Sequence, residues 1–471
     1  MFRFLNRYWV SAAVLSVVVE SGLILLSVWV ANLLRSWVYY GHLEGSAPAF
    51  FVSHLWLRQG VLVATILLGL YANGLYDFHE HFNPRELFIR IGRSLGLASV
   101  VLLALYYVTF GALTTGRGVF AVAMVVTAVL LTSWRLLLGW LLKSSANSDR
   151  VMIIGTDECA IDLAREVLQR KHLGFHIVGF VGDDPRLLGR SLINPRVLGT
   201  TGEVYALARQ YDARRIVVAQ RDLRGKLDMD QLLECKTSGI LVEQGTDYYE
   251  RITGKIMLEG LTRSWLIFSR GFVVSKSTLE AKLLSDSVVA AIGLVLALPL
   301  MLLTAIAIRL DSPGPVFFRQ ERVGKEGKIF TLWKFRSMRV DSEADGEPRW
   351  ATEKDPRVTR VGRLIRKLRI DELPQLLNVL VGDMSLVGPR PERKPFVDRL
   401  AEMSPFYAQR HVVRPGLTGW AQIRAPYAAS YEDSVEKLKY DLYYVKNLSF
   451  WLDASILIST VRIVLFGRGG R

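Results

Sequence analysis

Five apolar segments, each long enough to cross a lipid bilayer as a helix, decide what this chain can fold into. About 20 consecutive apolar residues are needed for such a crossing. Four of the segments follow one another in the first third of the chain, at residues 10–32, 58–75, 94–112 and 119–142. They predict a membrane α-helical N-terminal bundle, a four-helix transmembrane domain over residues 1–147.

Two of these segments carry one charge each, Glu20 in the first and Arg135 in the fourth. Charges inside a membrane are costly and can mark a transport path. Because the two charges here are single and differently placed, helix packing or snorkelling of the side chain is the favoured explanation.

The positions of the basic residues predict the orientation of the helices, because Lys and Arg gather in cytoplasmic loops. Basic residues precede the first segment, separate the second from the third, and follow the fourth: Arg3, Arg7, Arg85, Arg90, Arg93, Lys143 and Arg150. The other loops hold fewer: Arg35, Arg58 and Arg117. The N-terminus and everything after residue 143 are therefore expected in the cytoplasm.

Charge and cysteine content agree with this location. The formal net charge is +15 and 51% of the residues are hydrophobic, which is typical of a membrane protein that meets anionic lipid, nucleotide or phosphate. Cys159 and Cys235 have no paired spacing, so they predict neither a disulfide framework nor a zinc site, and they fit a reducing compartment.

Residues 148–270 alternate between strand-like and helical runs, with strands beginning near residues 150, 176 and 215. This alternation predicts an α/β Rossmann-like middle domain with a parallel sheet. Its first turn, GTDECA, has only Gly155 where a pyrophosphate needs several glycines, and Asp157 and Glu158 would repel phosphate. A structural or regulatory role is favoured over cofactor binding.

The fifth apolar segment begins at residue 283 and is interrupted by Pro299. Proline lacks an amide hydrogen and clashes with the preceding helical turn. Basic residues stand on both sides of the segment: Lys276, Lys282, Arg309, Arg319, Arg322, Lys325 and Lys328. We therefore expect a re-entrant helix over 283–309, broken at Leu298–Pro299, with both ends on the cytoplasmic face. A kinked full span is the alternative.

Two adjacent carboxylates, Asp371 and Glu372, lie in RIDELPQLLNVLVGDMSLVGPRP, among several arginines. Pro374 is tolerated only in the first turn of a helix, so the helix is expected to begin near Asp371. Its dipole would keep Asp371 ionised. One carboxylate can attack phosphorus while the other holds a proton or a divalent metal, for which Mg²⁺ is expected. Alone, such a pair is usually a solvated helix start.

Basic and apolar groups flank this pair in the sequence. Residues 317–335 read as a hairpin around a glycine-bearing turn, and Lys334 and Arg336 are spaced to point the same way. They are expected to hold substrate phosphates, lipid headgroups or both. Residues 449–466 form an apolar run interrupted by Asp453 and Arg462, which predicts an interfacial amphipathic helix or a helix in the soluble core.

The stretch RKLRIDELPQLLNVLVGDMSLVGPRP closely resembles the signature of the bacterial sugar transferases, the monotopic-type phosphoglycosyl transferases. Further matching motifs extend the resemblance to about residues 276–471: LDSPGPVFFRQERVG, KFRSM, RPGLTGWAQI and KLKYDLYYVKNLSFWLD. Four membrane helices and a Rossmann-like domain are similar to the large members, and the ending TVRIVLFGRGGR is similar to the exopolysaccharide subgroup. The resemblance implies an α+β catalytic domain over 275–471 with a re-entrant helix.

It also implies a reaction: a sugar-1-phosphate passes from a UDP-sugar to undecaprenyl phosphate at the bacterial inner membrane, with release of UMP. By motif, Asp371 is the nucleophile close to Mg²⁺, and Glu372 is its partner in metal binding or in the second step. Arg366 is the expected polyprenyl-phosphate contact. Pro389, Arg390 and Pro391 shape the nucleotide end. Other matched positions have loosely assigned substrate-binding roles: residues 311–315, Lys334, Arg336, Arg414, Tyr440 and Asp441. A homodimer is expected from the large relatives, and no nucleic-acid partner is expected.

Three other functions are alternatives with weaker support in the sequence. A membrane-anchored nucleotide-sugar dehydratase or epimerase needs a glycine fingerprint and a Tyr-x-x-x-Lys pair, and no Tyr here has Lys four positions later. A non-catalytic scaffold of polysaccharide assembly is disfavoured because the acidic pair and its arginines are intact. An inverting glycosyltransferase would depend on the DMD at 228–230, which also reads as an ordinary helix start.

Overall fold

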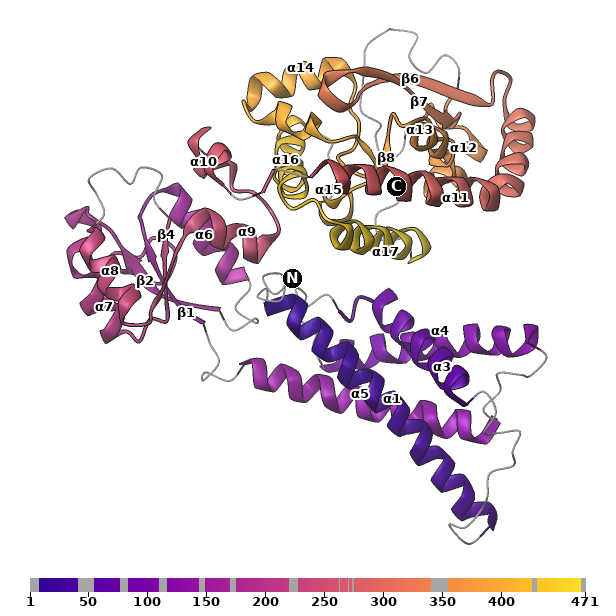
Figure 1. The fold of residues 1–471 in the computed structure, drawn as a ribbon, viewed down its shortest axis with the longest axis horizontal. Helices are drawn as coiled ribbons and strands as arrows, with labels where there is room; N and C mark the ends of the chain where they lie inside the picture. Colours follow the sequence, from indigo (N-terminus) through magenta and orange to yellow (C-terminus); the bar gives the residue numbers. More distant parts are fainter. Residues whose placement is uncertain are drawn as a thin grey trace. The chain divides into compact units, whose positions relative to one another are not determined.

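The computed structural model describes residues 8–40, 55–76, 84–109, 117–143, 149–169, 175–219, 228–261, 263–269, 271–272, 275–339, 355–425 and 430–466. They form two compact units, residues 1–245 and 246–471, drawn as ribbons in Figure 1. Residues 246–270, which we assigned to the middle domain from the sequence, lie in the second unit. Arg3, Arg7 and the ending after residue 466 lie outside the described residues.

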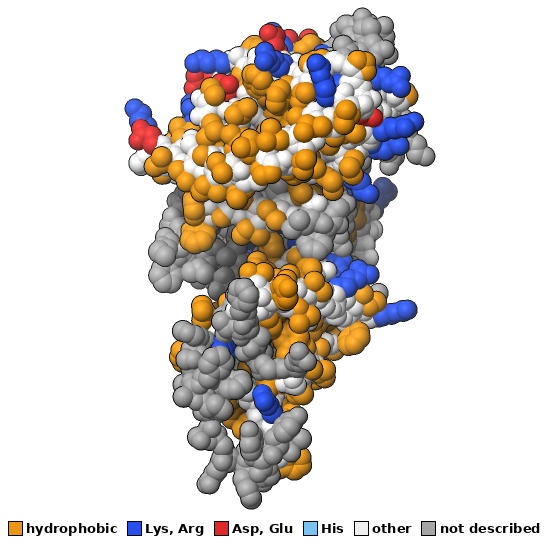
Figure 2. All heavy atoms as spheres, turned by 90° about the vertical axis from the view of Figure 1, so that its right-hand side faces the viewer, with side chains coloured by type: hydrophobic (Ala, Val, Ile, Leu, Met, Phe, Trp, Pro, Cys, Tyr) orange, Lys and Arg blue, Asp and Glu red, His pale blue; other side chains and the backbone are white. Residues whose placement is uncertain are grey.

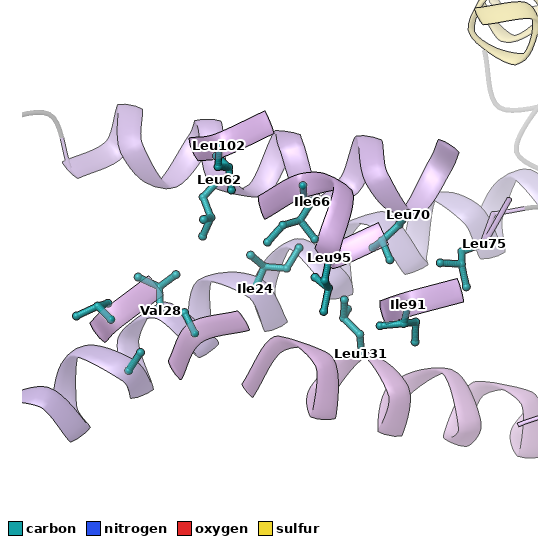
Figure 3. Packing of buried hydrophobic residues seen from close by; sticks show 14 of the residues in the cluster. Ile24, Val28, Leu62, Ile66, Leu70, Leu75, Ile91, Leu95, Leu102 and Leu131 are labelled. Carbon is teal, nitrogen blue, oxygen red and sulfur yellow. The ribbon is translucent and has the colours of Figure 1, made fainter. Parts of the chain in front are cut away.

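Four apolar helices form the membrane domain. They are α1 (Tyr8–Tyr40), α3 (Leu55–Ala72), α4 (Pro84–Val108) and α5 (Arg117–Lys143). Figure 3 shows how side chains from these helices, among them Ile24, Ile66, Leu102 and Leu131, meet in one buried cluster. Long apolar helices with such a shared core are the expected form of a membrane bundle.

By length and apolarity, four helices in the described part of the chain suit a membrane crossing: Ser16–Arg35 within α1, α4, Gly118–Trp140 within α5, and α11 (Lys276–Asp311) of the second unit. The apolar helix α3 is shorter. Helix α4 begins ten residues before the predicted start, so Arg85, Arg90 and Arg93 lie within it rather than in a loop. Pro84 at the first position and Glu86 in the first turn explain this early start.

The two charges inside the membrane helices pair with each other. Arg135 Nε lies 2.6 Å from Glu20 Oε1, and the side chain of Glu20 is fully buried. Tyr76 donates its hydroxyl hydrogen to the same carboxylate, and Arg135 also donates to the carbonyl of Leu75. The pair joins α1 to α5, which confirms helix packing as the explanation for both residues.

We expect Glu20→Gln or Arg135→Gln alone to destabilise the membrane domain, since each leaves one buried charge without its partner, at a cost of about 3–5 kcal/mol. The double variant should recover most of this loss. Thermal unfolding of the detergent-solubilised protein measures the effect. Single variants as stable as the parent protein would contradict it.

The middle domain has a five-stranded sheet in the order β3-β2-β1-β4-β5, and every pairing is parallel. Its strands are β1 (Asp149–Ile154), β2 (Phe175–Val181), β3 (Val197–Gly199), β4 (Arg215–Val218) and β5 (Leu241–Gln244). Its helices are α6 (Glu158–Gln169), α7 (Val204–Gln210) and α8 (Met229–Thr237). The predicted parallel α/β domain is confirmed. The short edge strands β3 and β5 were not predicted.

The second unit is an α+β domain. Its long helix α11 leads into the antiparallel hairpin β6 (Phe317–Val323) and β7 (Ile329–Phe335), which confirms the predicted hairpin. Two short parallel strands, β8 (Ser385–Val387) and β9 (Gly416–Thr418), pair further along the chain. The remaining helices are α9 (Gly245–Thr253), α10 (Arg263–Phe268), α12 (Arg360–Lys367), α13 (Gln375–Val381), α14 (Lys394–Met403), α15 (Trp420–Arg424), α16 (Tyr431–Lys446) and α17 (Phe450–Phe466).

Both ends of α11 are fastened to the second unit. Near its start, Lys282 Nζ lies 2.6 Å from Asp453 Oδ2 of α17. At its end, Arg336 donates to the carbonyls of Ile308 and Ser312. The helix continues through Pro299 as one element of 36 residues, and in Figure 1 its later part turns away from the direction of its first part. A straight helix of this length would extend about 54 Å.

A large apolar surface covers one face of this unit. The exposed hydrophobic residues of α11 include Leu284, Val288, Ile292, Val295, Leu296 and Leu303, and those of α17 include Phe450, Trp451 and Val461. In Figure 2 hydrophobic side chains gather over this face of the second unit, and Lys and Arg side chains lie along its edge. Apolar patches of this extent mark membrane or protein interaction sites.

Candidate active site

The acidic pair lies at the start of a helical segment, as predicted. A single helical turn, Ile370–Glu372, is followed by Leu373 and Pro374 in helical conformation and then by α13. Both carboxylates are nearly buried, with Asp371 8% and Glu372 9% exposed. Arg369, just before the turn, has a positive φ of 55°, which redirects the chain from α12 into this segment.

Glu372 is held by three cations. Its Oε1 lies 2.7 Å from an Arg390 guanidinium nitrogen and 3.3 Å from Lys334 Nζ, and its Oε2 lies 3.8 Å from Arg369. Burial alone would raise the pKa of Glu372, but Arg390, Lys334 and Arg369 together lower this pKa below its usual range. Glu372 is therefore ionised and fixed in position.

Asp371 has a different environment. Among the described residues, no side chain or backbone group forms a hydrogen bond or an ion pair with its carboxylate. Burial raises the pKa of Asp371 to about 6, and the positive charges of Lys334 and Arg366 only partly oppose this rise. Burial thus opposes the effect of the helix start, but with a pKa of about 6 Asp371 is still mostly ionised at neutral pH, and the predicted ionised state stays a prediction. Asp371 keeps its oxygens available for a ligand.

Arg390 is placed by a buried ion pair behind it. Arg410 donates to the backbone carbonyl of Arg390 at 2.9 Å and makes two contacts with Asp441, at 3.0 and 2.7 Å. Asp441 thus supports the loop that carries Arg390, where a direct substrate contact had been expected. Sequence reasoning missed Arg410, because nothing in the local pattern shows which arginine a buried aspartate will meet.

Asn378 of α13 is a second positioning residue that sequence reasoning missed. Its side-chain amide donates to the carbonyl of Thr331 at 2.7 Å and accepts from the backbone N–H of Trp333 at 3.1 Å. These bonds fasten α13 to β7 one residue before Lys334. The only sequence signal for this role was that Asn378 is a polar residue within the apolar run LLNVLV.

The remaining predicted residues lie elsewhere. All side-chain hydrogen bonds of Arg336 within the described residues go to Ile308, Ser312 and Pro313, so Arg336 closes the end of α11. The guanidinium of Arg414 lies beside Gly382, at the far end of α13. The ring of Tyr440 packs against Lys255, with 5.2 Å between its centroid and Nζ. Of the predicted basic residues, Lys334 and Arg390 therefore form ion pairs with Glu372, and Arg366 acts on Asp371 electrostatically.

The loop of Pro389, Arg390 and Pro391 approaches β9 so closely that only glycine fits. A Cβ atom on Gly416 would lie 2.0 Å from the backbone nitrogen of Gly388. The two segments also exchange hydrogen bonds, from Gly388 N–H to the Thr418 carbonyl at 2.8 Å and from Gly416 N–H to the Pro389 carbonyl at 2.9 Å. Arg322 donates to the Pro391 carbonyl at 3.1 Å.

We expect Gly416→Ala to destabilise the second unit by about 1–3 kcal/mol, because the backbone must move to admit the methyl group. Activity should fall further than stability alone explains, since the displaced loop carries Arg390. Thermal unfolding and turnover measure the two effects. Gly202→Ala, where a Cβ atom meets nothing within 4 Å, is the control. An unchanged Tm in Gly416→Ala would contradict the prediction.

A magnesium ion fits this site through one carboxylate. Within the described chain, no three His, Cys, Asp or Glu side chains form a metal-binding group. Mg²⁺ commonly uses one or two carboxylates and completes its shell with water and substrate phosphates. Asp371 has oxygens available for this purpose, whereas Glu372 is already occupied by Arg390 and Lys334. The donor set thus favours Asp371 as the ligand.

A membrane-associated α+β unit with a buried, unequal pair of carboxylates set among cations defines an enzyme suited to phosphoryl chemistry at a lipid surface. Residues 277–467 match the bacterial sugar transferase family. The chain is 34% identical over 336 residues, 69% of each chain, to the UDP-glucose:undecaprenyl-phosphate glucose-1-phosphate transferase of Escherichia coli (strain K12). The chain belongs to the bacterial sugar transferase family.

Two further relatives carry N-acetylgalactosamine and glucose in their names. Over 262 residues the chain is 45% identical to the UDP-N-acetylgalactosamine-undecaprenyl-phosphate N-acetylgalactosaminephosphotransferase of Aeromonas hydrophila, covering 56% of this chain and 61% of that one. Over 187 residues it is 43% identical to the UDP-glucose:undecaprenyl-phosphate glucose-1-phosphate transferase of Xanthomonas campestris pv. campestris, covering 39% of each. The chain thus spans less than two thirds of both of these relatives.

Residues 71–220 match a family described as a CoA-binding domain. The described residues at the carboxyl ends of β1 and β2, where such sheets bind ligands, do not fit an anionic cofactor. Asp157 and Glu158 follow β1, and Asp183 and Asp184 follow β2. Asp157 also accepts a hydrogen bond from the backbone N–H of Ala160 in its own helix, at 3.2 Å. Four carboxylates at this edge would repel a diphosphate.

Proposed function

We propose that this enzyme transfers a sugar-1-phosphate from a UDP-sugar to undecaprenyl phosphate, which releases UMP and forms undecaprenyl-diphosphate-sugar. This is the priming step of exopolysaccharide or O-antigen type glycan synthesis. Family membership and the names of the relatives support the reaction. The observation that carries it is the contrast between a fixed, ionised Glu372 and an unpaired Asp371 beside it.

In the first step, an Asp371 oxygen forms a bond to the phosphorus that bears the sugar. The bond from that phosphorus to the bridging oxygen breaks, and UMP leaves with the electron pair. In the second step, an oxygen of undecaprenyl phosphate forms a bond to the same phosphorus, and the Asp371 carboxylate is released. The two steps conserve the phosphate ester of the sugar and regenerate the enzyme.

Glu372 and its cations organise this chemistry. The ionised Glu372 orients Lys334 and Arg390 beside Asp371, where their charges offset the negative charge of the diphosphate. Arg366 of α12 acts on the Asp371 charge and is the candidate contact for the acceptor phosphate. A Mg²⁺ ion held by Asp371 and the substrate phosphates would neutralise further phosphate charge.

The membrane arrangement that we propose follows from α11. Both of its ends are fastened to the second unit, and exposed apolar residues extend along its length. These contacts favour a re-entrant helix that enters one leaflet and returns. Because UDP-sugars are cytoplasmic, the catalytic unit would lie on the cytoplasmic face of the inner membrane. A homodimer, expected from the large relatives, is measurable by light scattering in detergent.

The activity is tested by incubating the purified protein with Mg²⁺, undecaprenyl phosphate and a panel of UDP-sugars while UMP release is measured. Galactose, glucose and their acetamido derivatives belong in the panel. Release of UMP with one of them, together with a lipid-linked product, supports the proposal. Conversion of the UDP-sugar without UMP would favour a dehydratase or epimerase, and no turnover of any donor would favour a scaffold.

The rate of UMP release should fall as the pH falls below about 6. Asp371 must be ionised to attack, and its pKa is raised to about 6 by burial, so protonation removes the nucleophile below that pH. Glu372 stays ionised in this range because its pKa is lowered. Single-turnover rates between about pH 5 and 8 measure the effect. A rate that is constant across this range would contradict the assignment.

A further inference from the structure

The first residue of α13 carries a buried amide without a partner. Gln375 is 3% exposed, and its Nε2 forms no hydrogen bond within the described residues. Asn378, the other buried amide on the same helix, has both its donor and its acceptor satisfied by β7. The missing hydrogen-bond partner of Gln375 is therefore specific to this residue, and α13 is not poorly packed as a whole.

Gln375 lies just over one helical turn after Asp371. Residues 370–374 all have helical backbone angles, so Gln375 follows Asp371 by four positions along one helical segment. Its backbone hydrogen bonds join residues three apart, as in Leu373 N–H to the Ile370 carbonyl and Leu376 N–H to the Leu373 carbonyl, both at 3.1 Å, so Gln375 lies just over one turn beyond Asp371. A helical side chain also leans towards the N-terminus and covers the preceding turn. The Gln375 side chain therefore begins just over one turn after Asp371 and leans back towards the turn that contains it.

A buried N–H group without an acceptor costs about 1–3 kcal/mol relative to one that is satisfied. A phosphoryl group at Asp371 would bring non-bridging oxygens, which are strong acceptors, into this surrounding. The nearby cations Lys334 and Arg390 are already engaged by Glu372. Before substrate binds, the Gln375 amide is therefore a hydrogen-bond donor that no acceptor among the described residues satisfies.

We propose that the Gln375 amide donates a hydrogen bond to a non-bridging oxygen of the sugar-bearing phosphate, both in the bound donor and as its bond to Asp371 forms. Gln375 is on this view a catalytic residue that forms and breaks no covalent bond. The inference rests on the proposed function, because it assigns the phosphate that Gln375 meets. It explains why the protein retains a destabilising buried donor at this position.

Gln375→Met removes the donor and keeps a flexible side chain of similar length. We expect single-turnover UMP release with donor alone to fall about 10²-fold, the loss typical of one missing oxyanion donor. The Tm should stay unchanged or rise, because an unsatisfied polar group has been removed. Gln375→Glu, which keeps an acceptor but loses the donor, should be equally slow. Gln409→Met, on an exposed residue, is the matched control and should change neither value.

Three results would overturn the inference: wild-type release by Gln375→Met, wild-type release by Gln375→Glu, or a slower Gln375→Met whose Tm falls in proportion. A second measurement does not depend on turnover. In an Asp371→Asn background, the thermal shift produced by the UDP-sugar should shrink when Gln375→Met is added. An equal thermal shift in the two variants would overturn the inference, whether or not the parent protein releases UMP. Absence of UMP release by the parent protein would instead overturn the proposed function.

Discussion

Asp371→Asn is expected to abolish UMP release, with a loss on the order of 10⁴-fold or more, as for other covalent nucleophiles. Asparagine has nearly the same shape but cannot supply the anionic oxygen that attacks phosphorus. The Asp371 carboxylate makes no hydrogen bond or ion pair with described residues, so the exchange should leave Tm unchanged or raise it slightly. UMP release and thermal unfolding of the same preparation measure both effects.

The control for this experiment is Asp398→Asn, an exposed residue of α14 that pairs with Lys394 at 3.0 Å. It should release UMP at the parent rate. With donor alone, the intact mass of the parent protein should increase by one phosphosugar, whereas Asp371→Asn should gain nothing. Normal turnover by Asp371→Asn, or a phosphosugar adduct found on another residue, would show that the nucleophile has been assigned incorrectly.

Arg390→Met is expected to lower kcat/KM by about 10²–10³-fold. The variant removes the closest cation from Glu372, at 2.7 Å, and leaves that buried carboxylate with Lys334 and the more distant Arg369. Because 37% of the Arg390 side chain is exposed, the loss of stability should be smaller than for a fully buried pair, about 1–2 kcal/mol.

Arg390→Lys should fall between the parent and the methionine variant, because it keeps the charge but loses the planar, forked donor. Arg399→Met is the matched control, since Arg399 pairs with Glu402 on the exposed side of α14 at 3.5 Å. Steady-state kinetics and thermal unfolding separate the two effects. If Arg390→Met kept the parent kcat/KM, the cation would have no role in the reaction.

Local patterns in the sequence predicted much of this fold. Apolar runs identified the membrane helices, alternating strands and helices identified the parallel sheet, and a glycine-bearing turn identified the hairpin β6–β7. Pro374 marked the start of the helical segment with Asp371 and Glu372. Each of these signals depends on neighbours within a few residues, which is why a single sequence contains them.

Contacts between distant residues could not be predicted in the same way. The pairing of Arg410 with Asp441 and the unsatisfied amide of Gln375 depend on packing that no local period encodes. The helix start predicts an ionised Asp371, but it does not predict the burial that raises the pKa of Asp371 to about 6. Charge placement was visible in the sequence, whereas the degree of desolvation was not.

The pairing of Glu20 with Arg135 has a consequence for biosynthesis. Glu20 is synthesised about 115 residues before its partner Arg135. At roughly 5–20 residues per second, this delay lasts on the order of ten seconds. During that time α1 carries an uncompensated acidic group, so its stable partition into lipid must wait until α5 emerges. Nascent-chain crosslinking at α1 should therefore report prolonged contact with the translocation machinery.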